Sequence, residues 1–387
     1  MNDSDNQYNL IHLANFNSSN AGNGALSSGL EATIEEDFSK KVNWNREPWD
    51  DYTFQIIDFD EEFVDKINRS DGIIVGGAVT FNGRDYNHRT GTRFELPFEL
   101  WDNIKKPIIF YGLSYRNWPS QKYFHKDKFK YFINNCLSKK NICLGVRNDG
   151  TKQWIKETIG IDSKEIIEVP DSAVFVKSKV RKEDEIIEGK KNIIIAFNDE
   201  DPEFRYQKNP NFSREKVIND IAYAIQEISK KFDINVILCP HFFDDYRMIS
   251  DFISAVKPIF FHRNVLTTGL ISAKDSDLFY GRYSQVDLAI SMRVHSMSPC
   301  IGLNTPMIAI TTQNRMDYFL EKINLKDQMI TAGDPNLRKK IIDLASRYLT
   351  DNKEVKNSFQ RAKCLMREET LDFNKKIESK IESYVHI

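Results

Sequence analysis

The sequence has little of several features that would assign it to a simple class. Lys and Arg total 54 against 56 Asp and Glu, a net charge of −2, so the chain lacks the basic excess that drives binding to nucleic acids. The five cysteines are scattered and form no C-x-x-C pair, which argues against a disulfide framework or a zinc site and fits a reducing compartment. No apolar run approaches the ~18 residues that span a bilayer, and the N-terminus lacks the pattern of a signal peptide. We therefore expect a cytoplasmic protein with no transmembrane segment and no nucleic-acid partner.

Several catalytic and cofactor motifs are also missing. There is no Walker A sequence and no G-x-G-x-x-G, so nucleotide binding is only weakly indicated. No G-x-S-x-G, H-E-x-x-H or D-x-D stands at a useful place, which argues against serine hydrolases, zincins and nucleotide-sugar transferases that depend on an acidic metal motif. We expect no metal and no cofactor.

The chain does contain many short apolar, β-branched runs with helix-like segments between them, the pattern of β-α-β units and parallel sheets. The predicted strands of the first half are 8–16, 52–57, 71–75, 107–111, 142–146 and 166–169. Those of the second half are 192–197, 235–239, 258–261, 286–291 and 306–310. This rhythm predicts an α/β protein with two Rossmann-like, doubly wound domains.

A charge-dense stretch at 177–191 (KSKVRKEDEIIEGKK) reads as a surface linker between the two halves. We place an N-terminal domain at 1–180, a C-terminal domain at 181–350 and a helical tail at 351–387. The best helix is 214–232, whose apolar residues share one face behind a predicted Ser213 N-cap.

Ligands of open α/β sheets bind beyond the carboxyl ends of the strands, so strand-to-helix junctions are the places to search. The strongest junction carries Arg293 and His295, a pair of donors that suits a phosphate or another oxyanion beside a helix N-terminus. An isolated R-x-H is more often a surface salt bridge and a histidine bonded to the backbone. Arg147 stands at a second strand end, where an interdomain salt bridge is the alternative.

Two further junctions add candidates. Gln313 and Arg315 follow the strand at 306–310, and His241 follows the strand at 235–239. Glycine-rich turns stand at Asn20–Gly24 (NAGNG) and at 71–77 (DGIIVGG), where glycine allows a backbone to approach a ligand closely. The ligand-side candidates of these turns are Asn20, Gly22, Asn23, Gly24, Gly76 and Gly77; a purely structural role is the alternative.

Taken in order, these features resemble the polysaccharide pyruvyl transferase family. The resemblance runs from about Leu10 to Leu325 and rests on the NAGNG turn, DGIIVGGAV, KPIIFYGLSYRNWP with its turn at Gly112–Ser114, GVRNDGT, VPDSAVF, CPHFFDD and DLAISMRVHSMSPCIGLNTPMIAI. It implies a GT-B-like pair of domains facing across a cleft. It also implies transfer of pyruvate from phosphoenolpyruvate to two hydroxyls of a sugar in a surface or capsular polysaccharide, or in its precursor, as a cyclic ketal.

The resemblance also implies roles for individual residues. Arg147 and His295 match positions that meet the donor, and Arg315 stands where the family usually has Lys. Together with Arg293 and Gln313 they make the predicted phosphoenolpyruvate site, because arginine binds carboxylate and phosphate bidentately. His295 is the candidate acid/base, since histidine titrates near neutral pH. Asp149 or His241 is the candidate base for the sugar hydroxyl, and Ser114 joins the two glycine turns on the acceptor side.

Two other functions explain part of the pattern. A GT-B glycosyltransferase that uses a nucleotide sugar accounts for the fold and for the strand-end Arg/His site. A sugar- or phosphate-binding relative without activity is favoured by departures from the family pattern at Asn23, Asn148 and Arg315. The acceptor is a sugar or a lipid-linked oligosaccharide, which would bring the protein to the inner membrane face; the sequence leaves the oligomeric state open.

Overall fold

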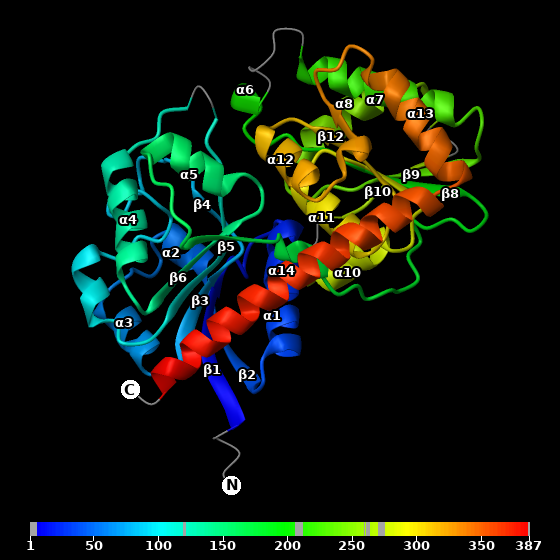
Figure 1. Ribbon diagram of the computed structural model, residues 1–387. Helices are drawn as coiled ribbons and strands as arrows, with labels where there is room; N and C mark the ends of the chain where they lie inside the picture. Colours follow the sequence, from blue (N-terminus) through cyan, green and yellow to red (C-terminus); the bar gives the residue numbers. More distant parts are fainter. Residues whose placement is uncertain are drawn as a thin grey trace. The chain divides into compact units, whose positions relative to one another are not determined.

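The computed structural model describes residues 6–118, 121–205, 212–258, 260, 264–269 and 275–385. The chain divides into two compact units (Figure 1). Unit 1 consists of Met1–Ser18, Gly29–Ser172 and Met366–Ile387, and unit 2 of Ser19–Ser28 and Ala173–Leu365. This division differs from three consecutive segments at 1–180, 181–350 and 351–387, because residues 19–28 pack within unit 2 and the C-terminal helix is shared between the units.

Unit 1 is built on a parallel sheet, which has seven strands within the described residues. The strands are β1 (Gln7–Ala14), β2 (Lys41–Pro48), β3 (Gly72–Gly76), β4 (Val79–Phe81), β5 (Ile108–Tyr115), β6 (Ile142–Arg147) and β7 (Ile166–Val169). Their order is β2-β1-β3-β5-β6-β7, and β4 pairs with β5. The chain therefore leaves β1 for a strand on one side and later returns to a strand on its other side.

Both faces of this sheet are apolar because successive side chains of a strand point to opposite faces. Ile73 and Val75 enter the apolar cluster on one face, with residues of helices α3 and α4, whereas Ile74 enters the cluster on the other face. That second face is covered by α1 and by the C-terminal part of α14, through Phe373 and Ile377. The helical segments of unit 1 are α1 (Ala21–Asp37, which begins in unit 2), α2 (Trp49–Thr53), α3 (Glu61–Asn68), η2 (Phe98–Asn103), α4 (Lys126–Ser138), α5 (Thr151–Ile159) and α14 (Lys353–Val385, which begins in unit 2).

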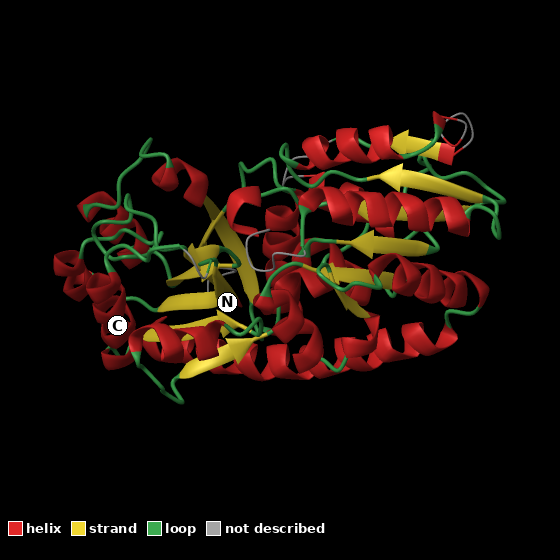
Figure 2. Ribbon diagram, turned by 90° about the horizontal axis from the view of Figure 1, so that it is seen from above, coloured by secondary structure: helices red, strands yellow, loops and turns green. Residues whose placement is uncertain are grey.

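Unit 2 is also built on a parallel sheet, with six strands within the described residues (Figure 2). They are β8 (Lys191–Ala196), β9 (Ile234–Leu238), β10 (Val265–Thr267), β11 (Leu288–Ser291), β12 (Met307–Thr311) and β13 (Met329–Thr331), in the order β10-β9-β8-β11-β12-β13. Counted from β8 this is the 3-2-1-4-5-6 order of a Rossmann domain, with its topological switch between β8 and β11.

The helical segments of unit 2 are η3 (Ser172–Phe175, which begins at the end of unit 1), α6 (Pro202–Arg205), α7 (Arg214–Ile228), α8 (Asp245–Ala255), α10 (Ser276–Tyr283), α11 (Val294–Gly302), α12 (Asn314–Lys322), η5 (Lys326–Gln328) and α13 (Leu337–Thr350). Helix α7 confirms the predicted N-cap, because the Ser213 hydroxyl accepts a hydrogen bond from the Lys216 amide at 3.1 Å. The two parallel, helix-covered sheets confirm the predicted fold class.

One predicted strand is wrong and another lies partly outside the described residues. Residues 52–57 are not a strand, because α2 ends at Thr53 and the Phe54 and Ile56 side chains beyond it are 74% and 72% exposed. The strand of this region is β2, an edge strand whose partly exposed, polar sequence hides its pattern. Residues 259 and 261 of the predicted strand at 258–261 lie outside the described residues, and β10 follows at Val265–Thr267.

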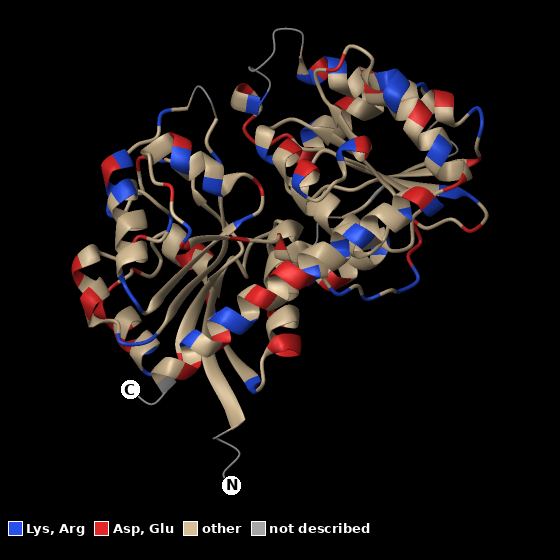
Figure 3. Cartoon of the chain, viewed as in Figure 1, with Lys and Arg blue, Asp and Glu red and all other residues tan. Residues whose placement is uncertain are grey.

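Cationic and anionic side chains are interspersed over both units, in agreement with the small net charge (Figure 3). No helix in the described part of the chain is both long enough and apolar enough to cross a membrane.

Candidate functional site

The switch point of the unit 2 sheet is organised by Arg293, which follows β11. Its Nε donates to the Phe197 carbonyl at 3.1 Å and to Asp245 Oδ2 at 2.9 Å, and its Nη1 donates to Glu200 Oε2 at 3.1 Å. Its Nη2 bonds the other Asp245 oxygen. The side chain thus ties together the loops that follow β8, β9 and β11.

Burial lowers the pKa of Arg293, but the charges of Asp245 and Glu200 outweigh burial and hold that pKa above its ordinary value. The buried guanidinium is therefore charged and already paired with two carboxylates. We predicted Arg293 as a ligand of the donor; its contacts show that most of its N–H groups serve protein acceptors, which suits a residue that positions the loops around it.

The Asp245 carboxylate was not among the predicted site residues. Its Oδ2 accepts hydrogen bonds from the His241 and Phe242 amides at 2.8 and 3.1 Å, in addition to the bond from Arg293. The only sequence signal was its place in CPHFFDD, where Asp244 and Asp245 both follow a strand end.

His295 lies in the first turn of α11, beside Arg293, and is partly exposed while its neighbours Val294 and Ser296 are buried. Its backbone φ of −81° and ψ of 16° depart from helical values, and its carbonyl accepts a hydrogen bond from the Tyr280 hydroxyl. His295 therefore lies just beyond the carboxyl end of β11, which ends at Ser291.

The predicted glycine-rich turn at 20–24 is instead the start of helix α1, which begins at Ala21, and its Gly22 packs directly against this histidine. A Cβ on Gly22 would lie 2.6 Å from both Cβ and Nδ1 of His295, so this contact requires glycine. The Gly22 amide donates to Asn20 Oδ1 at 3.0 Å, and the Ala21 amide donates to the His241 carbonyl at 3.3 Å. Unit 2 therefore brings together three predicted regions that are far apart in the sequence. Asn23 and Gly24 lie in the same first turn of α1.

His241 is fully buried at the end of β9. Its Nε2 lies 2.6 Å from the Tyr283 hydroxyl, which also accepts a hydrogen bond from Ser296 Oγ at 3.1 Å. Burial, followed by the positive charges of Arg293 and His295, lowers the pKa of His241 well below its ordinary value. His241 is therefore neutral at physiological pH.

The remaining predicted residues of unit 2 follow β12. Gln313 precedes α12, and its Oε1 accepts a hydrogen bond from Arg315 Nε at 2.7 Å. A further cation, Arg205, is buried nearby, where its Nη1 donates to Thr312 Oγ1 at 2.7 Å. Because β11 and β12 are parallel neighbours, Gln313 and Arg315 share the carboxyl edge of the sheet with Arg293 and His295. Arg205 was missed because it comes from the short helix α6 rather than from a strand end.

In unit 1 the predicted residues lie at the carboxyl ends of β5 and β6. Asp149 is buried and accepts hydrogen bonds from the Ser114 and Thr151 hydroxyls, each at 2.6 Å. Arg147 ends β6, and its Nε lies 3.4 Å from Oδ2 of Asp171, a residue that the predictions did not include. Unit 1 thus brings Arg147, Asp149 and Ser114 to one edge.

The second glycine turn has a packing role in unit 1. A Cβ on Gly76 would lie 2.7 Å from His12 Nε2, and Gly77 has a φ of 53°, which favours glycine. His12 in turn lies 2.9 Å from Glu31 through its Nδ1, and Arg46 Nη2 bonds the other Glu31 oxygen at 2.6 Å. These contacts favour a purely structural role for Gly76 and Gly77 over a role in ligand binding.

Each unit therefore presents its own set of predicted residues at the carboxyl edge of its sheet. His295, Arg293, Gln313 and Arg315 do so in unit 2, and Arg147 does so in unit 1. Their joint action on one donor stays a prediction. Among the described residues, no group of three or more His, Cys, Asp or Glu side chains is arranged to hold a metal ion.

Comparison with known protein families identifies the chain. The model of the polysaccharide pyruvyl transferase family matches residues 20–314, well over half of the 387 residues. The chain belongs to the polysaccharide pyruvyl transferase family. The matched span begins at Asn20 and contains His241, Arg293 and His295; it ends one residue before Arg315. No curated protein matches the sequence.

Several solved structures share the fold of this chain at low sequence identity. An α,α-trehalose-phosphate synthase (UDP-forming) from Burkholderia vietnamiensis is 10% identical with a TM-score of 0.53, covering 98% of this chain and 97% of that one. The trehalose-6-phosphate synthase OtsA is 8% identical with a TM-score of 0.54, covering 97% and 99%. The N-terminal domain of a trehalose-6-phosphate phosphatase from Candida albicans is 12% identical with a TM-score of 0.50, covering 97% and 98%. At these identities the likeness shows the fold alone, which is GT-B-like.

Proposed function

We propose that this pyruvyl transferase takes pyruvate from phosphoenolpyruvate and joins it to two hydroxyls of one sugar as a cyclic ketal, releasing phosphate. The observation that carries the proposal is the presentation of His295 beside a helix N-terminus at the switch point of the unit 2 sheet, within the span that matches the family. A site of this kind suits a small phosphorylated anion, because backbone N–H groups and the helix dipole favour negative charge there.

The reaction needs three proton transfers, one to carbon and one from each hydroxyl, and no oxidation. Protonation of the methylene carbon of phosphoenolpyruvate makes C2 electrophilic, and a sugar hydroxyl then forms a bond to C2 and loses its proton. A second hydroxyl of the same sugar attacks C2 as the bond from C2 to the phosphate oxygen breaks, and its proton leaves with the phosphate. Neither substrate is oxidised or reduced, so we propose that no cofactor takes part.

His295 is the proposed acid that protonates the methylene carbon, because it is the partly exposed titratable side chain of the α11 turn. Gln313 and Arg315 are proposed to bind the donor from the neighbouring strand end, and the donor contact of Arg147 stays a prediction. Arg293, held by Asp245 and Glu200, positions the turn that carries His295.

Asp149 and His241 remain the candidates for the base that accepts the hydroxyl proton. Asp149 already accepts two hydrogen bonds, from Ser114 and Thr151. His241 is neutral and fully buried, and its Nδ1 has no hydrogen-bond partner among the described residues. The pH dependence of turnover in the D149N and H241N variants distinguishes the two candidates. Only the variant that lacks the base should lose the limb of the profile that reports the titration of that base.

The acceptor is proposed to be a sugar of a surface or capsular polysaccharide, or of its lipid-linked precursor. Because phosphoenolpyruvate is a cytoplasmic metabolite, we propose that the enzyme acts in the cytoplasm, at the inner membrane face where the acceptor is lipid-linked.

The proposed reaction is tested by incubating the purified protein with phosphoenolpyruvate and a panel of oligosaccharides, and following phosphate by ³¹P NMR and the ketal methyl group by ¹H NMR. We expect equal amounts of phosphate and ketal, with no turnover of UDP-sugars. Release of a nucleotide from UDP-sugars without consumption of phosphoenolpyruvate would instead establish a glycosyltransferase. Binding without turnover across the whole panel would establish an inactive relative.

A further inference from the structure

The switch point of the unit 1 sheet holds an arginine, Arg93, that no part of the proposed mechanism uses. In the strand order β2-β1-β3, the next two strands of the chain lie on opposite sides of β1. Such a switch point opens a crevice beyond the carboxyl ends of the strands. Arg93 lies there. Its Nη2 donates to Oδ1 of Asn15, which directly follows β1, at 3.3 Å, and its Nη1 donates to the carbonyl of Val79, just beyond β3, at 3.2 Å.

The hydrogen-bond acceptors of Arg93 are all neutral. The third is Thr53 Oγ1, which accepts from Nη2 at 2.8 Å, and the guanidinium stands over the Trp49 ring at 5.4 Å from its centroid. Among the described residues no carboxylate lies within ion-pair distance of Arg93, in contrast to Arg147 and Arg293. A largely desolvated cation without a paired anion is unfavourable, so this position favours the arrival of one.

Two acidic side chains, the Tyr86 phenol and then the Asp50 carboxylate, attract Arg93 from beyond ion-pair distance and oppose the effect of burial on its pKa. The Asp50 carboxylate accepts a hydrogen bond from the Asn17 amide at 3.3 Å and forms no ion pair with Arg93 within the described part of the chain. Burial raises the pKa of Asp50, and burial lowers that of Arg93. Arg116 adds a second positive charge to the surroundings of Arg93.

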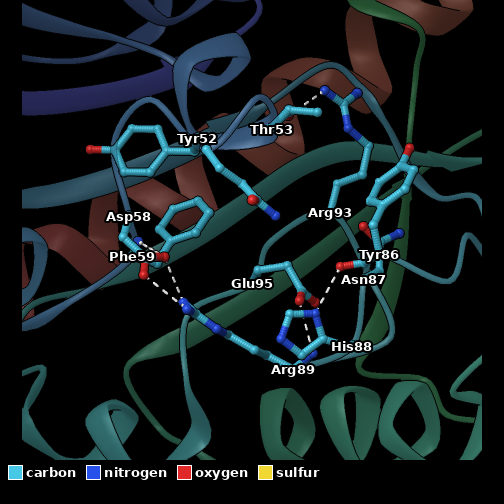
Figure 4. Close-up of a pocket in the computed structure, with 11 residues that line it drawn as sticks. Tyr52, Thr53, Asp58, Phe59, Tyr86, Asn87, His88, Arg89, Arg93 and Glu95 are labelled. Carbon is cyan, nitrogen blue, oxygen red and sulfur yellow. Dashed lines mark hydrogen bonds and ion pairs between the residues drawn. The ribbon is translucent and has the colours of Figure 1, made fainter.

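Arg93 lines a cavity of about 250 Å³ (Figure 4). Its other lining residues are Tyr52, Thr53, Gln55, Asp58, Phe59, Tyr86, Asn87, His88, Arg89 and Glu95. The cavity is smaller than the ~300–1,000 Å³ pockets of drug-sized ligands and suits a single sugar ring.

The other charged groups of this cavity are already engaged. Arg89 forms a bidentate pair with Asp58 at 2.6 and 2.8 Å (Figure 4). Glu95 accepts hydrogen bonds from the Arg89 and Thr90 amides at 2.8 and 2.9 Å. The Tyr86 ring remains 52% exposed at the cavity, and an aromatic ring of this kind packs against the apolar face of a sugar. Asn87 adds an amide that bonds Asn82.

We propose that this cavity binds an anionic sugar of the acceptor saccharide, with Arg93 receiving a carboxylate or phosphate group and Tyr86 packing on the ring. The inference rests on the proposed function, because it takes the ligand to be part of the acceptor. It places recognition of acceptor charge in unit 1, apart from the residues assigned to the reaction.

The test measures binding to the whole chain by ligand-observed NMR titration with four probes: D-glucuronate, glucose 1-phosphate, neutral D-glucose and phosphoenolpyruvate. We expect the wild type to bind the two anionic sugars at least about tenfold more tightly than glucose, the effect of one charge-assisted hydrogen bond. The R93Q variant should lose this preference. The matched control R69Q, which changes an exposed arginine of the same unit, should keep it.

Three results would overturn the proposal. One is equal binding of glucuronate to R93Q and to the wild type, and another is loss of phosphoenolpyruvate binding in R93Q with unchanged binding of anionic sugars. If circular dichroism shows that R93Q does not fold, the same binding titrations of the Y86A variant test the proposal. We expect Y86A to weaken binding of charged and neutral sugars alike, and unchanged binding would be the third contrary result. If the wild type binds anionic sugars, R93Q does not, and the wild type never consumes phosphoenolpyruvate, the site is upheld and the proposed function is refuted.

Discussion

The contact between Gly22 and His295 predicts that one added methyl group impairs catalysis more than stability. In Gly22→Ala the new Cβ would lie 2.6 Å from Cβ and Nδ1 of His295 and 2.8 Å from its Cγ. Carbon atoms in ordinary contact stand ~3.5–4.0 Å apart, so the imidazole and the α1 turn must separate by roughly 1 Å.

The two consequences differ in size. Overpacking costs about 1–3 kcal/mol of stability, and the better helix propensity of alanine recovers up to about 1 kcal/mol of that. A displacement of about 1 Å at a catalytic group lowers the rate by roughly 10²-fold. We therefore expect G22A to fold, with a modest loss of stability, and to release phosphate from phosphoenolpyruvate about a hundredfold more slowly.

The assay compares turnover at saturating phosphoenolpyruvate with the urea-unfolding free energy for the wild type, G22A and G269A. Gly269 is the control in the same unit, because a Cβ there meets nothing within 4 Å among the described residues. G22A with wild-type turnover and wild-type stability would refute the reasoning, because the histidine would then not be held by this turn.

Two further predictions concern buried charges. Asp245→Asn removes a carboxylate from the buried Arg293 guanidinium and should lower the unfolding free energy by about 3–5 kcal/mol in urea titrations; a loss below about 1 kcal/mol would mean that Arg293 does not depend on this partner. Although burial raises the pKa of Glu31, hydrogen bonds from His12 and Arg46 outweigh it and hold that pKa at about 2, against an ordinary value of 4.5. The carboxylate therefore stabilises the fold above pH 4.5 by up to about 3 kcal/mol, and this contribution disappears as the pH falls toward 2. Glu31→Gln should flatten the acid limb of stability measured between pH 5 and 2; an unchanged limb would contradict the assignment.

Much of the fold follows from local pattern. Buried strands such as β3 (GIIVG) and β12 (MIAIT) read as continuous apolar runs because both of their faces are covered. The edge strand β2 has no such apolar run, because most of its residues are polar and its side chains are largely exposed or only partly buried. The run around Phe54 and Ile56 has the composition of a strand but ends in exposed side chains, which composition alone does not reveal.

The candidate site was predictable only in part. His295 and Arg293 stand out because they follow a strand and precede a helix. The partners that decide what Arg293 does, Asp245 and Glu200, come from other loops, and only the folded chain brings them together. The same holds for Gly22, which sequence places in a glycine-rich turn but only the structure places against His295.

The measurement that tests the central claim most directly is the rate of phosphate release from phosphoenolpyruvate, with the pyruvylated acceptor as the companion product, for the wild type and His295→Ala. His125→Asn is the control, because His125 has a φ of 54° that asparagine tolerates and belongs to the other unit. The account predicts a fall of about 10²–10⁴-fold in H295A, the usual contribution of a general acid, and little change in H125N. Wild-type turnover in H295A would contradict it.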